Sequence, residues 1–407
     1  MERKQVGAGD RLRNSSRCAL SKSPLRKNVL SFLNKRKEQG EYEYLVKSSP
    51  AVLTRATSPL ACQAIQSDQF VYLSEQDPSR WEKLFHVSII GGKAIHLAEM
   101  NIPASTSPDE PNIDNIPFWG LRDPTVPLKI PEAGCCTTKA YSAYISSLGL
   151  QERLQQILND FEDENSQTDF EEALRLIREE IINEEAQKID DPLPVDLQTS
   201  VRKFLKGLPP TVKSLAVRSS STMEDQAGSS FAGQYDTYLN VPCLYDDVSL
   251  AIRRCWASMW QERLLSYRTQ HKIAAPKLPD MAVVVQHQLN PVASGVLFTM
   301  NPINGNTDQM VIESCYGLGE GVVCGEISPH TFIVDGRSRD VLSRDVTPQA
   351  QKFSFSSSHS GNGGFIELVD TTEEEKTKTS LDDSQIFKLV QLGKQIACFY
   401  QHPQDIE

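Results

Sequence analysis

Three short apolar segments in the second half of the chain constrain its fold more than any other feature. They are LAVRSS at 215–220, MAVVVQ at 281–286 and GVLFTM at 295–300. Each has the length of a strand and is rich in β-branched residues, which favour strands. FVYL, which begins at Phe70, predicts a further short strand. The chain is therefore expected to contain buried sheet.

Helical patterns surround these segments. Apolar residues recur every three or four positions from 138 to 186, and a last helix is predicted over 383–400. Residues 246–270 predict one long amphipathic helix that carries Trp256, Trp260 and Arg263. Strands that alternate with helices, together with segregated insertions, predict a two-lobed α/β or α+β domain.

The charge of the chain is unevenly distributed. The 407 residues carry a formal net charge of −11, yet residues 1–37 hold eleven Lys or Arg against two acids, so the remainder carries −20. An acidic body argues against nucleic-acid binding, because phosphate contacts need clustered cations. The basic, Ser-containing head has the composition of a disordered tail or of an organelle-targeting segment.

The same features suggest a domain organisation. We expect residues 1–66 to be a tail and 67–407 to form one folded domain, interrupted by a Pro-rich loop at 102–128 and a Ser/Gly-rich loop at 354–364. No stretch approaches the roughly 18 uninterrupted apolar residues of a membrane span. Nine cysteines without a CxxC pair predict reduced thiols in a cytoplasmic protein and no metal site built from them.

The first segment whose residues suit ligand binding is Ile90-Gly91-Gly92-Lys93. Polyphosphates are bound by backbone N–H groups, fixed cations and glycines that let the main chain approach closely. The segment predicts a strand end that runs through two glycines into a helix, with Lys93 on the first turn. A simple turn with an exposed lysine has the same pattern, and the P-loop sequence is absent.

Two further segments offer similar parts. In AVRSSSTMEDQAGSSFAGQYDTYLNV (216–241) a strand ends at Arg218, hydroxyl residues follow, and FAGQ predicts a hairpin. An arginine fork flanked by hydroxyls suits phosphate oxygens, although a Ser-rich surface loop with a structural ion pair fits equally well. Within 281–326, Gln286 has the donor and acceptor to bind an adenine edge or is only a polar strand end, and CYGLGEGVVCGE supplies flexible backbone.

Together these segments resemble the ATP-grasp-type nucleotide-binding domain shared by phosphoenolpyruvate synthase, pyruvate phosphate dikinase and rifampin phosphotransferase. The resemblance covers about 81–407, and its landmarks follow the family order: GGK, AVRSSST-ED-FAGQ, CWASMWQERLLSYR, VVVQ, SGVLFT, GLGEGVVCGEISP and PQDIE. The version at 216–241 is similar to that of the synthase and the rifampin enzyme, because pyruvate phosphate dikinases carry a Met/Gly-rich stretch in place of FAGQ.

The resemblance implies ATP and Mg²⁺ as ligands and assigns roles to individual residues. Lys93 and Arg218 are expected to clamp the phosphates and to act in catalysis. The other expected site residues are Gly233 and Thr237 along the nucleotide, Gln286 near the adenine or ribose, Glu407 at the nucleotide or Mg²⁺, and Asp405 as the second acid of a metal-binding pair.

The sequence also departs from the family pattern. It ends at DIE, where the family continues with a Gln-x-Arg element, and it has no Ser-His-Ala-type phosphohistidine site. His359, in SSSHSGNGG, precedes its glycines and is interpreted as a loop residue. The pattern thus implies an ATP-binding, kinase-class domain whose target histidine lies on a domain supplied by another chain or missing from this one. A rifampin phosphotransferase-like kinase, a non-catalytic ATP-binding or regulatory protein and a stand-alone ATP-grasp ligase are the alternatives, and the acceptor substrate stays open.

Overall fold

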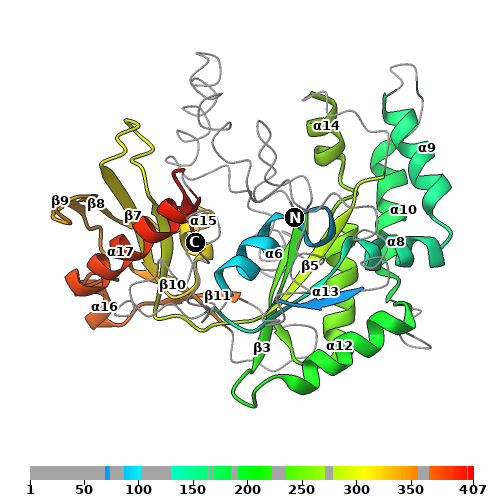
Figure 1. The fold of residues 1–407 in the computed structure, drawn as a ribbon, viewed down its shortest axis with the longest axis horizontal. Coiled ribbons are helices and arrows are strands. Elements are labelled where there is room, and N and C mark those ends of the chain that lie inside the picture. The colour runs from blue at the N-terminus through cyan, green and yellow to red at the C-terminus, as the bar shows by residue number, and fades with distance from the viewer. Residues whose placement is uncertain are drawn as a thin grey trace, which may run out of the picture.

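The protein is built from two lobes, each organised around a five-stranded antiparallel sheet (Figure 1). The computed structural model describes residues 69–73, 87–101, 130–162, 166, 169–184, 191–221, 235–270, 278–355, 366–400 and 402–407. Helices and antiparallel sheets together make the fold mixed α+β, which is one of the two forms that the sequence predicts.

The sheet of the first lobe has the strand order β1-β2-β5-β3-β4. The central strands β3 and β5 are almost wholly buried, as their β-branched sequences predict. The five strands are β1 (Phe70–Tyr72), β2 (Ala133–Cys136), β3 (Ser214–Ser221), β4 (Thr237–Pro242) and β5 (Met281–His287).

Helices cover both faces of this sheet. One face packs against the large apolar cluster that contains Trp256 and Trp260, and the other packs against α6 (Val87–Asn101) through Ile90, Ala94 and Ala98. Side chains alternate along a strand, so β5 contributes Val283 and Val285 to the first cluster and Ala282 and Val284 to the α6 cluster. The remaining helices of the lobe are α8 (Thr138–Ser147), α9 (Gln151–Glu162), α10 (Phe170–Ile182), α12 (Val195–Gly207), α13 (Tyr245–Ala257) and α14 (Glu262–Gln270).

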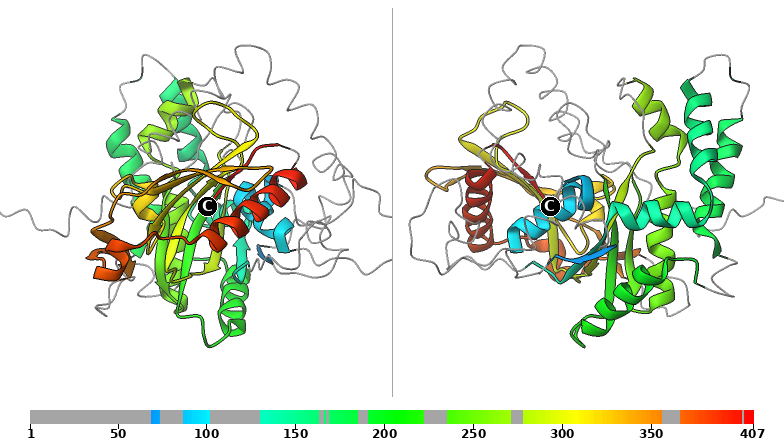
Figure 2. Two further views of the ribbon diagram at one scale, coloured as in Figure 1. Left: turned by 90° about the vertical axis from the view of Figure 1, so that its left-hand side faces the viewer. Right: turned by 45° about the vertical axis from the view of Figure 1, so that its right-hand side comes forward.

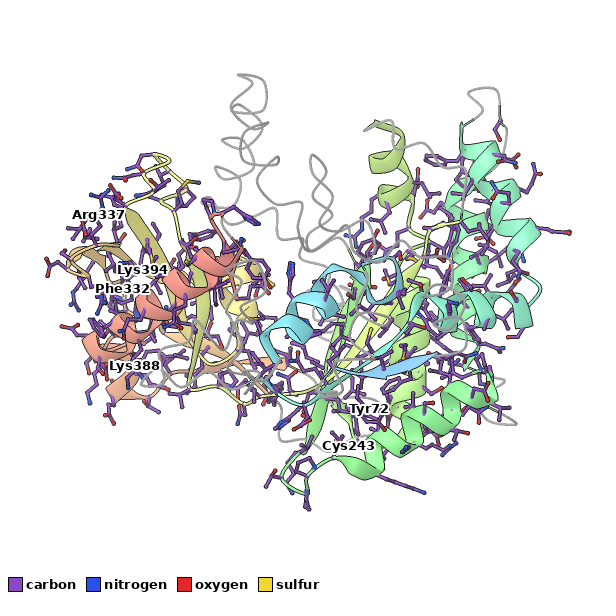
Figure 3. All side chains as sticks on the ribbon, in the orientation of Figure 1. Tyr72, Cys243, Phe332, Arg337, Lys388 and Lys394 are labelled. Carbon is purple, nitrogen blue, oxygen red and sulfur yellow. The ribbon has the colours of Figure 1, made fainter. Side chains whose placement is uncertain are left out.

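The sheet of the second lobe has the strand order β12-β6-β7-β8-β9. Its strands are β6 (Ala293–Phe298), β7 (Gln309–Tyr316), β8 (His330–Asp335), β9 (Val341–Asp345) and β12 (Asp405–Ile406). The long helix α17 (Asp383–Tyr400) has the bounds that the sequence predicts. It packs Ile386 and Val390 against Phe332 of β8, and Lys388 and Lys394 extend from the same helix (Figure 3).

The opposite face of this second sheet is covered by a short helix and a hairpin. These are α15 (Glu320–Val323) and the pair β10 (Gln351–Phe355) and β11 (Ile366–Asp370), which share a cluster with Val296, Phe298 and Val311. The helix α16 (Glu373–Thr377) follows the hairpin and begins with a capping box at Thr372.

Two predicted elements differ from the structure. Ile90 does not end a strand, because residues 87–90 are already helical and α6 kinks at Gly91. Residues 246–270 form two helices, α13 and α14, separated at 258–261. The break lets the buried Trp260 donate its indole N–H to the Tyr141 hydroxyl at 3.1 Å, a contact that helical periodicity alone cannot reveal.

The two lobes meet around the last residues of the chain. Helix α6 lies between the lobes, and the C-terminal end lies beside α6 in each view (Figures 1 and 2) and beside α15 in Figure 1. The His96 ring of α6 contacts the Tyr400 ring of α17 with 5.2 Å between centroids. Strand β12 then adds to the edge of the second sheet by pairing with Leu297 and Phe298 of β6.

Several predicted features fall outside the described residues. These are the tail at 1–66, the Pro-rich loop at 102–128, the FAGQ hairpin with Gly233, and His359. None of the helices in the described part of the chain has the length and apolarity to cross a membrane.

Candidate functional site

The kink in α6 brings Lys93 to the end of β3. Gly91 has a φ of +73°, a conformation that favours glycine, and its backbone presses against Ser220. The buried Ser220 hydroxyl donates to the Ile90 carbonyl at 2.8 Å and accepts the Ala94 N–H at 3.1 Å, which ties both sides of the kink to β3. Lys93 then lies on the first turn after the kink, and its ammonium donates to the Ser219 carbonyl at 3.3 Å.

Gly91 is required here for a steric reason as well. A Cβ atom at this position would lie 2.0 Å from the Ser220 carbonyl oxygen. The GGK sequence therefore allows a helix to approach a strand closely enough to place a lysine beside it.

Three of the other predicted residues lie on the α6 face of the first sheet. Arg218 pairs with Thr237 of β4 on one side and with Val284 of β5 on the other. Val284 packs in the α6 cluster, so Arg218 and Thr237 share that face. Gln286, two residues further along β5, lies on the same face and is buried. The sheet thus assembles residues that are up to 68 positions apart in the sequence (286 − 218).

The second lobe contributes carboxylates to the same place. Glu407 follows β12, and its carboxylate lies 3.5 Å from the Arg218 guanidinium of the first lobe. Asp405 lies two residues earlier, within β12, where it pairs with Phe298. Strand alternation therefore places Asp405 and Glu407 on the same side of the sheet, away from Ile406, which packs against the α17 cluster.

Glu320 is a further acid of this site that the sequence interpretation did not select. It begins α15, directly after the tight turn of Gly317–Gly319. Burial raises the pKa of the Glu320 carboxyl, the nearby Glu407 charge raises it further, and Arg218 lowers it. A glutamate inside the glycine run was the available signal, but its proximity to Glu407 depends on how the two lobes meet.

The site therefore combines cations from one lobe with carboxylates from the other. Lys93 and Arg218 supply positive charge, and Glu320 and Glu407 supply hard oxygen ligands. Within the described residues, no group of three or more His, Cys, Asp or Glu side chains could hold a metal ion. Two neighbouring carboxylates nevertheless fit Mg²⁺, because this ion usually takes one or two protein carboxylates and completes its shell with water and phosphate oxygens.

The adjacent cysteines belong to the core of the first lobe. Cys135 packs in the α6 cluster and Cys136 in the cluster on the other face of the sheet, since neighbouring strand residues point in opposite directions. Burial raises the pKa of both thiols. The two adjacent cysteines therefore pack on opposite faces of the sheet.

These features define a class of protein: a two-lobed α+β domain with a glycine-kinked helix and a charged site suited to a polyphosphate. The family model described as "Pyruvate phosphate dikinase, AMP/ATP-binding domain" matches residues 87–407. The chain belongs to this family, as its motifs predict.

Curated relatives agree with this assignment. The chain is 34% identical over 327 residues to a probable phosphoenolpyruvate synthase of Methanocaldococcus jannaschii. The aligned region covers 79% of this chain and 24% of that protein. It is 32% identical over 324 residues to a rifampicin phosphotransferase of Streptomyces sviceus, covering 79% and 32%. It is 37% identical over 216 residues to the prodigiosin synthesizing transferase PigC of Serratia marcescens, covering 53% and 23%. The chain thus spans about a quarter to a third of the length of these relatives.

Proposed function

We propose that this chain is the ATP-binding part of a dikinase similar to phosphoenolpyruvate synthase, with an ATP-grasp-type fold. In this proposal Mg·ATP binds between the two lobes and phosphorylates a histidine on a separate domain. The family match and the relatedness to a probable phosphoenolpyruvate synthase support the proposal.

The convergence of Arg218, Glu407 and Glu320 is the observation that carries it. The ion pair of 3.5 Å is longer than a charge-assisted hydrogen bond, and the side chains of Arg218 and Glu407 are 31% and 46% exposed. Phosphate oxygens can therefore take over the Arg218 contact. A cation between Glu320 and Glu407 would relieve the repulsion from Glu407, which adds to the effect of burial in raising the Glu320 pKa.

The proposal gives each residue of the site a role. Lys93 and Arg218 clamp the phosphates, and the Glu320 and Glu407 carboxylates bind Mg²⁺, which neutralises phosphate charge when it is bound. The remaining proposed contacts to the nucleotide or metal are Gly233, Thr237, Gln286 and Asp405.

Mg·ATP binding to the Arg218→Ala variant tests the proposal. We expect the affinity, measured by isothermal titration calorimetry, to fall by at least about 100-fold, the size of a lost bidentate charged contact. Arg337→Ala is the matched control, because Arg337 is an exposed arginine that pairs with Asp308 on the tip of the second lobe (Figure 3). Equal affinity in wild type and Arg218→Ala would remove the phosphate-clamp role.

A rifampin phosphotransferase-like kinase is the second candidate, because similarity to a rifampicin phosphotransferase covers 79% of the chain. A non-catalytic ATP-binding protein is the third. The mass of the endogenous polypeptide, measured by immunoblot, distinguishes them in part. A band much heavier than 45.4 kDa would favour a full dikinase, and a band at that mass would favour a split enzyme or a regulatory protein.

A further inference from the structure

Both ends of the loop that carries Glu320 are hydrogen-bonded to one buried side chain, that of Gln349. Strands β7 and β8 pair up to Ser314 and His330 and then separate, and the residues between them form the glycine-rich turn and α15. Gln349 lies where the strands separate and is only 3% exposed.

The Gln349 amide bonds to backbone on both sides of this loop. Its oxygen accepts the Tyr316 N–H at 3.0 Å, and its nitrogen donates to the Ser314 carbonyl at 3.2 Å and to the Ser328 carbonyl at 3.0 Å. One backbone donor and two carbonyl acceptors are satisfied only by this orientation of the amide, so the partners determine it. The side chain thus bonds to the edge of β7 as a peptide group of a neighbouring strand would.

The chain after Gln349 supports the same loop near its start. The Phe353 carbonyl accepts the Leu318 N–H at 3.0 Å, and a Cβ atom at Gly317 would lie 2.2 Å from that carbonyl oxygen. Lys352 of the same strand forms a largely buried ion pair of 2.5 Å with Glu375, which anchors the strand to α16. The segment from Gln349 to Phe353 therefore fixes the position of the turn before Glu320.

We propose that Gln349 is a positioning residue for the nucleotide site: it closes the base of the loop 317–328 and so holds the Glu320 carboxylate beside Glu407 and Arg218. This inference rests on the proposed function, since Gln349 acts on nucleotide only through Glu320. A loop released at its base would keep its residues but lose the preorganised position of its carboxylate.

A double-mutant cycle on Mg·ATP affinity tests the proposal. Gln349→Met keeps the length of the side chain and removes its hydrogen bonds. We expect it to weaken Mg·ATP binding about 10-fold in the wild-type background and less than about twofold in the Glu320→Gln background, because coupled residues are not additive. Equal losses in both backgrounds, or no loss in either, would overturn the positioning role.

Asn301→Leu is the matched control. Asn301 is also a buried amide that closes a loop of the same sheet, donating to the Gln309 side chain and accepting the Ile303 N–H. It follows β6 at the end opposite to Ala293, which pairs with Tyr316, so it lies far from the Glu320 loop. We expect this variant to lower the melting temperature comparably and to change Mg·ATP affinity by less than about twofold.

Hydrogen exchange separates a failure of this inference from a failure of the proposed function. In nucleotide-free protein, Gln349→Met is expected to accelerate exchange of the 316–327 amides at least about fivefold while leaving 331–335 unchanged. Unchanged exchange would overturn the inference even if the wild type binds Mg·ATP. If the wild type binds no Mg·ATP, the proposed function fails, and exchange still decides whether Gln349 holds the loop. Gln349→Glu replaces Gln349→Met if the latter does not fold.

Discussion

The guanidinium of Arg218 lies 3.5 Å from the carboxylate of Glu407, and this contact joins the two sheets of the domain. Arg218 lies in the third strand of the sequence and Glu407 directly after the last strand, so the pair forms only when both lobes are assembled. Exposed ion pairs contribute about 0–1 kcal/mol to stability. The pair is therefore expected to contribute little to the stability of the fold.

Lys93→Ala is expected to weaken Mg·ATP binding strongly but less completely than Arg218→Ala. An ammonium is a flexible point charge without the bidentate fork of arginine, so we expect a loss of about 10- to 30-fold. The measurement is the ATP-dependent rise in melting temperature, which should shrink in the variant.

Lys388→Ala provides the control for this experiment. Lys388 is exposed on α17, on the outer side of the second lobe (Figure 3). Its removal should leave the ATP-dependent rise unchanged. The same rise in Lys93→Ala and wild type would exclude a phosphate contact for Lys93.

Comparing Gly91→Ala with Gly149→Ala tests how much a steric clash of the added methyl group costs beyond the backbone strain at positive φ. Both glycines have positive φ, +73° and +68°, which strains an alanine at either position, and the ψ of 174° at Gly91 adds to the strain because essentially only glycine adopts this combination. Nothing lies within 4 Å of a Cβ at Gly149, whereas a Cβ at Gly91 meets the Ser220 carbonyl. We expect Gly91→Ala to lower the free energy of unfolding by at least about 3 kcal/mol, clearly more than Gly149→Ala, in urea denaturation. Similar losses would show that α6 can move away from β3 at little cost.

Glu320→Gln is expected to stabilise the nucleotide-free protein. Because the folded-state pKa of Glu320 is raised above its ordinary 4.5, the folded protein binds this proton more tightly than the unfolded chain. Its contribution to stability is therefore greatest below pH 4.5 and is lost as the pH rises through the raised pKa. Above that pH, Gln removes the repulsion from Glu407 and the cost of a buried charge. We expect a gain of about 0.5–2 kcal/mol in the free energy of unfolding at pH 8.

The same substitution should impair the site. Mg·ATP affinity of Glu320→Gln is expected to fall about 10-fold, because a charged carboxylate ligand of the cation is replaced by a neutral amide. Nucleotide titrations with and without Mg²⁺ check this, since only the Mg²⁺-dependent part of the affinity should change. A variant that is no more stable than wild type at pH 8 would contradict the proximity of the two carboxylates.

We expect the protein to lose stability at mildly acidic pH because of the buried His330. Its Nδ1 accepts the Ser380 N–H at 3.0 Å, so the proton lies on Nε2, which faces the Thr347 carbonyl at 3.1 Å. Burial lowers the pKa of His330 below its ordinary 6.5, so the unfolded chain takes up a proton first. The stability that neutral His330 provides is complete above pH 6.5 and is lost as the pH falls towards the folded-state pKa.

Urea denaturation between pH 7.5 and 5 checks this expectation. His330→Gln should remove this part of the pH dependence, even though it lowers stability overall by about 1–3 kcal/mol through lost buried hydrogen bonds. His402→Gln, at an exposed histidine, should retain the wild-type dependence. Parallel pH curves for wild type and His330→Gln would assign the effect to other groups.

Local sequence determined much of the architecture and most of the candidate site. The β-branched runs around Val217 and Val284 predicted the central strands, and the periodic residues of 383–400 predicted α17 with its bounds. Strand and helix periodicity depends on neighbouring residues, so these elements are visible without tertiary contacts. The roles expected for Lys93, Arg218 and Glu407 follow from the resemblance of their motifs to the family, because the local chemistry of each motif also fits an ordinary surface residue.

Only the tertiary structure decided how these pieces meet. The kink at Gly91 depends on Ser220, the break before α14 on the burial of Trp260, and the raised pKa of Glu320 on its burial and on Glu407. Gln349 has no sequence signal at all, because its partners are backbone atoms that the fold brings to it. Each of these effects arises between residues that are far apart in the chain, and such contacts exist only once the lobe, or the pair of lobes, that brings them together has formed.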